Sequence, residues 1–210
     1  SRGLGDVYKR QMLEQAGDSM EGKRCLVSGS GNVATHAAEK CLQLGGTPLT
    51  LSDSGGFIHA ANGLSQEQID WVKDLKGVRR GRISEAADEF NDITFHEGQR
   101  PWGVEADCAM PSATQNEVNA AEAATLLKNG VKVVAEAANM PCEQGAVDAF
   151  HDAGILFGPA KAVNAGGVGV SGLEMSQNSA RIAWGEDNLR KLLEDMMKDI
   201  HDACVKHGKD

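Results

Sequence analysis

Two features near the start of the chain could together hold a ligand rich in phosphate: a glycine turn at residues 29–34 and the acidic residue Asp53. The turn reads G-S-G-N-V-A and fits the pattern G-x-G-x-x-A. At Gly31 the missing side chain would let the backbone approach a pyrophosphate, and the N–H groups that open the following helix would bind it. Asp53 lies 22 positions after Gly31, close to the ~20 at which such sites place an acid facing a ribose. The residues that this pattern predicts around a dinucleotide are Ser30, Gly31, Asn32, Val33 and Asp53.

The elements around the turn are those that a dinucleotide site requires. Residues 24–28 form an apolar run of strand length, and apolar side chains then recur at helical spacing until Gly45. A second apolar run, residues 49–52, ends at Asp53. A strand, a glycine turn and a helix in this order give the motif its structural context. The alternative is a pair of turn glycines and a loop aspartate in an unrelated α/β protein.

The rest of the chain alternates short apolar runs with helical patterns. Strands are expected at residues 92–95, 106–110, 131–135 and 155–157, and helices at residues 65–75, 84–90, 118–127 and 142–153. Residues 65–68 read S-Q-E-Q, a capping-box pattern that opens the first of these helices at Ser65. This alternation predicts a Rossmann-like, doubly wound α/β fold, with a mostly parallel sheet flanked by helices and with further helices at the C-terminus. Residues 54–57 and 164–169 are expected to be loops, and helix is expected from about residue 173 with a break near Gly185.

Composition and charge exclude several classes of function. The 210 residues carry a net charge of −9 and are 41% hydrophobic and 24% charged, as in an ordinary globular protein. So acidic a chain offers no basic field to a nucleic acid. It has no run of 18 apolar residues and no apolar signal sequence, so we expect no membrane partner and a cytoplasmic protein. The five cysteines form no C-x-x-C pair, which is typical of reduced thiols.

One spacing resembles a metal motif. His201, Cys204 and His207 follow one another at intervals of three on a predicted helix. On a helix these positions spread over roughly 240–260° or more of the circumference, so the three side chains cannot converge on one ion. We therefore predict no metal site.

Four loops carry distinctive motifs in a fixed order. They read S-G-S-G-N-V-A, A-M-P-S-A-T-Q-N-E, A-E-A-A-N-M-P and N-A-G-G-V-G-V-S-G-L-E-M-S-Q-N. Together they resemble hexameric glutamate dehydrogenase, particularly the NADP-dependent bacterial type, from about residue 12 to the end. The resemblance implies reversible oxidative deamination of L-glutamate to 2-oxoglutarate and ammonium, with NADP(H) as coenzyme, NAD(H) as the alternative coenzyme, and a homo-oligomer that is a hexamer in the family.

The resemblance also implies a part of a longer enzyme. The family's N-terminal substrate domain, which carries the catalytic lysines and aspartate, has no counterpart here, so no catalytic residue is expected in this chain. We expect an unmatched leader over residues 1–11, a dinucleotide-binding domain over residues 12–172 and a truncated helical segment over residues 173–210. The alternatives are a leucine-, valine- or phenylalanine-type amino-acid dehydrogenase and a non-catalytic dinucleotide-binding module.

Near the adenosine, the resemblance points to a serine, a carboxylate and a lysine. Ser52, Asp53 and Ser54 match a Ser-Asp-Ser of NADP-preferring relatives, although a carboxylate at Asp53 would repel a 2′-phosphate. Lys76 matches a family lysine near the adenosine and could offset that charge, helped by Arg80. The alternative is a solvated helix end, where basic side chains favour the helix dipole.

Near the nicotinamide, the resemblance points to four polar residues. It places Gln115, with Thr114 beside it, at the nicotinamide ribose, Asn139 against the same ribose and Asn164 near the carboxamide. The alternatives are that Thr114 or Asn116 caps the next helix and that the asparagines are satisfied turn residues.

Ser171, with Val168 packing nearby, is the expected substrate contact. It matches the family serine that hydrogen-bonds the side-chain carboxylate of glutamate. Family members that act on leucine, valine or phenylalanine lack this polar partner, so Ser171 favours glutamate as the substrate. A helix N-cap is the competing role for Ser171.

Overall fold

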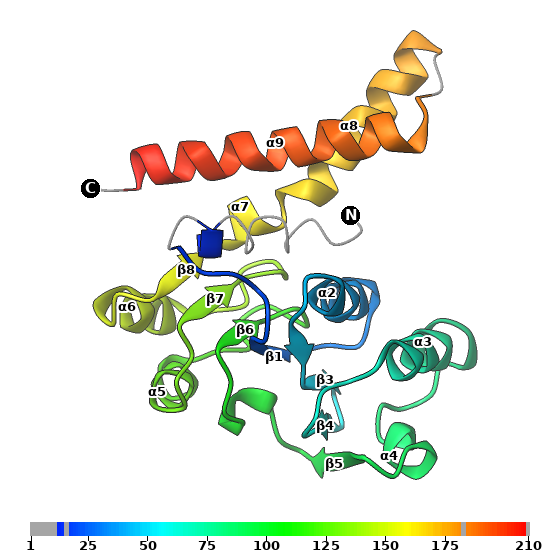
Figure 1. The fold of residues 1–210 in the computed structure, drawn as a ribbon, viewed down its shortest axis with the longest axis vertical. Coiled ribbons are helices and arrows are strands. Elements are labelled where there is room, and N and C mark those ends of the chain that lie inside the picture. Colours follow the sequence, from blue (N-terminus) through cyan, green and yellow to red (C-terminus); the bar gives the residue numbers. More distant parts are fainter. Residues whose placement is uncertain (1–11, 15–16, 182–183, 209–210) are drawn as a thin grey trace.

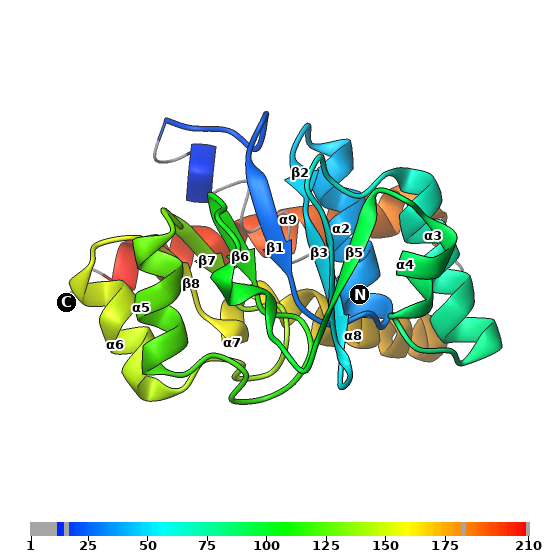
Figure 2. The same ribbon diagram turned by 90° about the horizontal axis from the view of Figure 1, so that it is seen from below.

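The computed structural model describes residues 12–14, 17–181 and 184–208. At its centre lies a five-stranded sheet in the order β2-β1-β6-β7-β8, in which all neighbours are parallel (Figures 1 and 2). The strands are β1 (Arg24–Val27), β2 (Thr47–Pro48), β6 (Cys108–Met110), β7 (Val133–Ala135) and β8 (Leu156–Gly158). Because β2 lies on one side of β1 and β6 on the other, the switch point of the sheet is between the carboxyl ends of β1 and β6.

Helices cover both faces of this sheet. They are α2 (Asn32–Gln43), α5 (Ala120–Lys128), α6 (Gln144–Asp152), α7 (Ala160–Val163) and α9 (Glu186–His207). Successive strand residues point to opposite faces, so Cys25 of β1 belongs to the core shared with α2, α7 and α9, and Leu26 to the core shared with α5 and α6. Cys108 and Ala109 of β6 repeat this division. The predicted doubly wound α/β fold is therefore confirmed.

A second, antiparallel sheet of three strands adjoins the first. Its strands are β3 (Thr50–Asp53), β4 (Gly56–Ala60) and β5 (Ile93–Glu97), in that order. β3 continues the path of β2 after one residue. The Thr50 hydroxyl keeps it against β1, because its Oγ1 accepts the Val27 N–H and donates to the Val27 carbonyl, both at 3.0 Å. This contact sets the end of β3, and so Asp53, beside the end of β1.

The prediction of a loop at residues 54–57 was wrong for its second half. Gly56 and Phe57 begin β4, which pairs with β3 through Asp53 and Gly56. Gly56 has a φ of +146°, and a Cβ there would collide with the His96 carbonyl of β5. The glycine therefore permits close strand contact, rather than marking a loop.

The helical segment after β4 carries a cluster of basic residues at positions 76–82. It consists of α3 (Gln66–Asp74), the π-helical turn η1 (Leu75–Arg79) and, after a break, α4 (Glu85–Glu89). Ser65 caps α3 as its sequence predicts: its Oγ accepts the Gln68 N–H at 3.2 Å, and its own N–H donates to Gln68 Oε1 at 2.8 Å. Ile69 and Val72 pack into the core shared with α2 and the antiparallel sheet. α3 is thereby fixed against the body of the domain.

The C-terminal helices form a hairpin above the sheet (Figure 1). α8 spans Ala165–Ala180, so the prediction of a loop at residues 164–169 was wrong, and the predicted boundary after residue 172 falls inside a continuous helix. Packing explains why the glycines within residues 164–169 are helical: Met196 of α9 occupies the space that a side chain at Gly169 of α8 would take. Within the described part of the chain, no helix is both long and apolar enough to cross a membrane.

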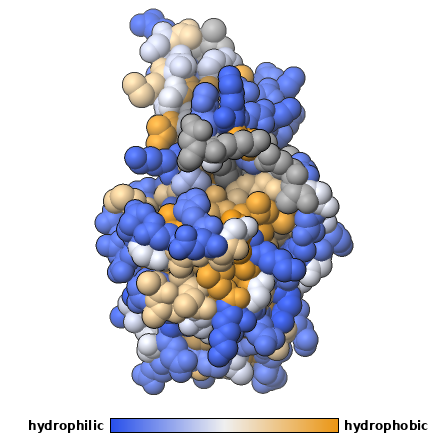
Figure 3. Space-filling view, turned by 90° about the vertical axis from the view of Figure 1, so that its left-hand side faces the viewer, coloured by the Kyte–Doolittle hydropathy of each residue, from blue (hydrophilic) through white to orange (hydrophobic). Residues whose placement is uncertain are grey.

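β8 is an edge strand of the parallel sheet, and its residues Leu156 and Phe157 are half-buried. Figure 3 views the molecule from the side on which β8 and α6 lie in Figure 1 and shows apolar surface among hydrophilic residues. The described part of the chain thus leaves apolar surface accessible on this side.

Candidate functional site

A cavity of about 450 Å³ opens at the switch point of the parallel sheet. Its walls come from the glycine turn with the first turn of α2, from the end of β3 and from the loop after β6. The predicted coenzyme residues that line it are Ser30, Gly31, Asn32, Val33, Asp53, Ser54 and Thr114. Arg100 and Glu117, which no sequence motif singles out, line the same cavity.

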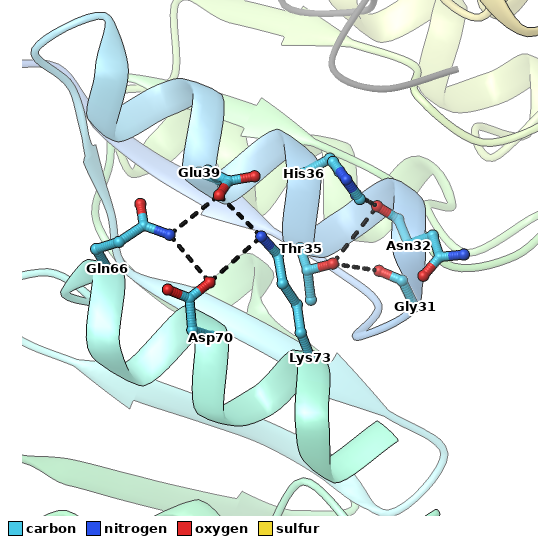
Figure 4. Close-up of polar contacts among 8 residues, drawn as sticks. All are labelled: Gly31, Asn32, Thr35, His36, Glu39, Gln66, Asp70 and Lys73. Atoms are coloured by element: carbon cyan, nitrogen blue, oxygen red, sulfur yellow. Dashed lines mark hydrogen bonds and ion pairs between the residues drawn. The ribbon is translucent and has the colours of Figure 1, made fainter. Parts of the chain in front are cut away.

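The glycine turn brings backbone to the cavity wall. Gly29 has a φ of +82°, and a Cβ there would lie 3.0 Å from the Ser112 carbonyl oxygen and 3.2 Å from the Ala113 Cα. Gly31 is the N-cap of α2 and has no side chain with which to cap it. Its carbonyl accepts the Thr35 N–H at 3.0 Å and the Thr35 hydroxyl at 3.1 Å (Figure 4). The N–H groups of the first turn of α2 thus remain suited to an anion.

Asp53, on the part of the cavity wall that β3 provides, is paired with Lys76. Lys76 Nζ lies 2.9 Å from Asp53 Oδ2 and 3.0 Å from the Gly81 carbonyl. Burial alone would raise the pKa of Asp53, but hydrogen bonds from Lys76 and from the N–H groups of Ile83 and Gly55 outweigh it and hold that pKa below its usual value. Lys76 does not line the cavity itself; it neutralises the carboxylate that does.

The arginines of the basic segment at residues 76–82 contact different parts of the molecule. The Arg82 guanidinium donates to Ser54 Oγ at 2.9 Å, next to Asp53. Arg79 instead lies over the Trp71 ring, 4.4 Å from its centroid, and pairs with Asp74 at 2.8 Å. Arg80, which we expected to assist Lys76, is exposed and adopts a left-handed φ of 55°. Arg82 is therefore a second cation close to Asp53, one that our sequence analysis did not single out.

A polar network joins α2, whose first turn lines the cavity, to α3, which leads into the turn that bears Lys76 (Figure 4). Glu39 of α2 accepts Gln66 Nε2 at 3.0 Å and Lys73 Nζ at 2.8 Å, both from α3. The Lys73 hydrogen bond lowers the pKa of Glu39. Asp70 completes the network by accepting from Gln66 at 3.1 Å and from Lys73 at 3.4 Å. The network fixes the spacing between the N-terminus of α2 and the segment that bears Lys76.

Thr114 and Gln115 are exposed on the loop after β6. The idea that Thr114 or Asn116 caps the next helix was wrong. Asn119 caps α5: its side chain accepts the Glu122 N–H at 3.0 Å, and Glu122 returns the contact to the Asn119 N–H at 2.9 Å. Thr114 is thereby left without a capping role.

Asn139 and Asn164, predicted from separate loops, lie side by side. Asn164 Nδ2 donates to Asn139 Oδ1 at 2.7 Å and, more weakly, to the Ala138 carbonyl at 3.5 Å. Neither asparagine lines the 450 Å³ cavity, and Gln115 does not line it either. The structure thus joins the two asparagines into one group outside this cavity.

Ser171 and Val168 lie on α8, also outside the cavity. Ser171 is exposed, and its Oγ donates to the Gly167 carbonyl at 3.4 Å. The alternative role of Ser171 as a helix N-cap was wrong, because α8 begins at Ala165. Val168 is 77% exposed, so both side chains are open to solvent on one helix.

Glu117 is the buried acid of the site. Only 5% of it is exposed, and its Oε1 accepts the N–H groups of Ala113 at 2.9 Å and Thr114 at 3.3 Å. Burial raises the pKa of Glu117. The neighbouring Arg100 donates to the Glu117 carbonyl at 2.8 Å and to both carboxylate oxygens of Glu122 at 3.0 Å. No motif could have identified this acid, since its role depends on how the loop folds back on itself.

The described residues contain no group of three or more His, Cys, Asp or Glu side chains arranged to hold a metal ion. His201 and Cys204 lie on α9, where Cys204 packs against the core shared with α2 and α7. Four of the five cysteines are buried.

Comparison with known proteins identifies the family. The sequence profile described as glutamate/leucine/phenylalanine/valine dehydrogenase matches residues 2–210. The chain belongs to this dehydrogenase family. The match begins within residues 1–11, which we expected to be an unmatched leader and which lie outside the described residues.

Named relatives agree with this assignment. The NAD(P)-specific glutamate dehydrogenase of Xylanibacter ruminicola is 51% identical, and the NADP-specific glutamate dehydrogenase of Escherichia coli 46% identical, each over 98% of this chain and 46% of the relative. The crystal structure of glutamate dehydrogenase 2 of Plasmodium falciparum matches with a TM-score of 0.94 and 41% identity, over 99% of this chain and 46% of that one. The chain thus spans a little under half the length of these relatives.

Proposed function

We propose that the chain is the coenzyme-binding part of a glutamate dehydrogenase that interconverts L-glutamate with 2-oxoglutarate and ammonium, using NADP(H). The observation that carries this proposal is the switch-point cavity, which is lined both by a glycine turn and by the lysine-neutralised Asp53. Relatives of 46% to 51% identity that are named glutamate dehydrogenases support the reaction.

The residues of the cavity suit a dinucleotide phosphate. The N-terminal turn of α2 provides N–H donors and the positive end of the helix dipole for the pyrophosphate. The space beside Gly31 is open, since a Cβ built there meets no atom within 4 Å. When NADP(H) is bound, it accepts or supplies the hydride. Ser30, Asn32 and Val33 hold its phosphates in place.

The adenosine end suits a 2′-phosphate, despite the acid. Asp53 would repel this phosphate, but its charge is already offset by Lys76 at 2.9 Å. Arg82 brings a second cation to Ser54, which lines the cavity. We infer that Ser54, Lys76 and Arg82 favour NADP(H), whereas Asp53 alone would favour NAD(H).

The remaining predicted residues complete the proposal. Thr114 and Gln115 lie on the loop after β6 and bind the nicotinamide ribose, and the Asn139–Asn164 pair orients the nicotinamide. On α8 the hydroxyl of Ser171 binds the side-chain carboxylate of glutamate. The long hydrogen bond of 3.4 Å to the Gly167 carbonyl supports this role, because it leaves the hydroxyl open to a stronger partner. Val168 packs beside that substrate.

We also propose a cytoplasmic homohexamer, in keeping with the resemblance. Light scattering after size-exclusion chromatography of this chain tests the assembly: a mass of six chains supports it, and a monomeric mass over the whole accessible concentration range contradicts it.

Separate titrations with NADPH and NADH, followed by nicotinamide fluorescence, test the coenzyme assignment. The chain should bind NADPH more tightly than NADH. In Lys76→Ala and Arg82→Ala, NADPH affinity should fall by about tenfold or more, equivalent to ~1.4 kcal/mol, while NADH affinity changes little. Arg79→Ala is the matched control, because Arg79 belongs to the same basic segment but lies over Trp71. Equal binding of both coenzymes, unaffected by either variant, would refute the assignment.

A further inference from the structure

Glu117 is costly to the fold, which raises the question of what it does. Glu117 is only 5% exposed as a residue, so its carboxyl group loses much of its hydration, a loss that an apolar side chain in the same space would not suffer. Its backbone is held from the opposite side, because its carbonyl accepts Arg100 Nη1 at 2.8 Å and the indole N–H of the buried Trp102 at 3.2 Å. The carboxyl group is thus aimed from a fixed anchor into the loop that ends β6.

The backbone donors that meet this carboxyl group belong to the loop after β6. The N–H groups of Ala113 and Thr114 donate to Oε1 at 2.9 and 3.3 Å. Just before them in the chain, the Ser112 N–H donates to the hydroxyl oxygen of Ser28, which follows β1, at 2.8 Å. Glu117 therefore holds the loop after β6 at the point where Ser112 joins that loop to the start of the glycine turn.

The glycine turn and the loop after β6 are in close van der Waals contact at Gly29. A Cβ at Gly29 would lie 3.0 Å from the Ser112 carbonyl oxygen and 3.2 Å from Ala113 Cα. A small shift of residues 112–114 would therefore move them against the glycine turn or away from it. Thr114, whose N–H Glu117 holds, lines the cavity itself.

We infer that Glu117 is a positioning residue for coenzyme binding: its carboxyl group holds the loop of residues 112–114 at the distance from the glycine turn that the nicotinamide half of the coenzyme requires. This inference rests on the proposed function, and it concerns the half of the coenzyme farther from Asp53. Removal of the carboxyl group should therefore weaken the complete dinucleotide and spare its adenosine half.

The test compares two ligands on variants of the full 210-residue chain. The ligands are NADPH and adenosine 2′,5′-bisphosphate, which lacks the nicotinamide half. For Glu117→Ala we expect NADPH to bind about tenfold more weakly and adenosine 2′,5′-bisphosphate to bind within about twofold of the wild type. Glu117→Gln, which keeps one acceptor oxygen for the loop, should recover NADPH binding to within about threefold of the wild type.

Glu122→Ala is the matched control. Glu122, in the first turn of α5, is a nearby carboxylate that accepts a backbone N–H, that of Asn119, at 2.9 Å, but it does not hold residues 112–114. It should lower stability without changing the ratio of the two affinities. Amide hydrogen exchange gives a second readout, because the Ala113 and Thr114 amides should exchange faster in Glu117→Ala and not in Glu122→Ala.

Two results would overturn the inference: NADPH binding by Glu117→Ala as tight as that of the wild type, or an equal loss of both ligands. A wild-type chain that binds neither ligand contradicts the proposed function itself, and the inference falls with it. A wild type that binds both, with a Glu117→Ala variant that folds and binds both equally well, overturns the inference alone.

Discussion

The contact between Asp53 and Lys76 is the clearest electrostatic feature of the site, and its strength can be estimated. Asp53 Oδ2 and Lys76 Nζ are 2.9 Å apart, and the side chain of Asp53 is only 10% exposed and that of Lys76 only 23%. A hydrogen bond to a charged group contributes ~1.5–3 kcal/mol when buried, and a fully exposed ion pair contributes ~0.2–1 kcal/mol. Because the Asp53–Lys76 pair is partly buried and lies between these two limits, we expect a coupling free energy of about 1–2 kcal/mol.

A double-mutant cycle measures this coupling directly. Asp53→Asn keeps the shape of the side chain and removes its charge, and Lys76→Met keeps most of the aliphatic stem. Urea unfolding of the wild type, both single variants and the double variant isolates the pairwise free energy. A coupling below about 0.3 kcal/mol at pH 7 would refute the idea that Lys76 neutralises Asp53.

The pH dependence of the coupling follows from the pKa of Asp53. Because this pKa is lower in the folded chain than the ~3.9 of an unfolded aspartate, the pair stabilises the fold fully above that value. The stabilisation is lost as the pH falls through the folded pKa. The measured coupling should therefore stay constant from pH 8 to pH 6 and decline only in acid.

Three further predictions concern single positions. Ser65→Ala removes the capping box shared with Gln68 and should lower the free energy of unfolding by about 1 kcal/mol in urea; no loss would show that the cap is not used. Gly29→Ala should cost about 1–3 kcal/mol and abolish NADPH binding, since Gly29 has a positive φ and no room for a Cβ next to Ser112; intact binding would contradict the close approach. Burial raises the pKa of Glu117, so its protonated carboxyl group stabilises the fold at a pH below ~4.3, and this stabilisation is lost as the pH rises through the folded pKa. The free energy of unfolding of Glu117→Gln should therefore rise relative to that of the wild type between pH 4 and pH 8. If urea unfolding shows the same difference between the two proteins at every pH, the pKa shift is refuted.

The sequence was informative where a local pattern decides the structure. The turn at residues 29–34 and the acid at Asp53 could be predicted because a phosphate approaches backbone only at glycine, and because strand length fixes where the next strand ends. The cap at Ser65 was equally readable, since both of its hydrogen bonds lie within four residues. The parallel sheet followed from the alternation of apolar runs and helical patterns.

The misses have physical causes. The predicted loop at residues 54–57 is wrong at its second half because a glycine pair reads as a turn, whereas Gly56 makes close contact with β5, which lies far along the chain. The start of α8 was taken for a loop because glycine is a poor helix former, whereas its packing against Met196 of α9 decides the outcome. Arg82 and Glu117 were overlooked for a related reason. Their partners, Ser54 and the loop amides, become neighbours only after folding.

A crystal structure of this chain with NADPH tests the central claim most directly. We expect the pyrophosphate at the N-terminal turn of α2, between Ser30 and Val33, and the 2′-phosphate within hydrogen-bond reach of Ser54 and Arg82. A coenzyme bound with its phosphates away from the glycine turn, or a 2′-phosphate pointing away from Ser54 and Arg82, would contradict it.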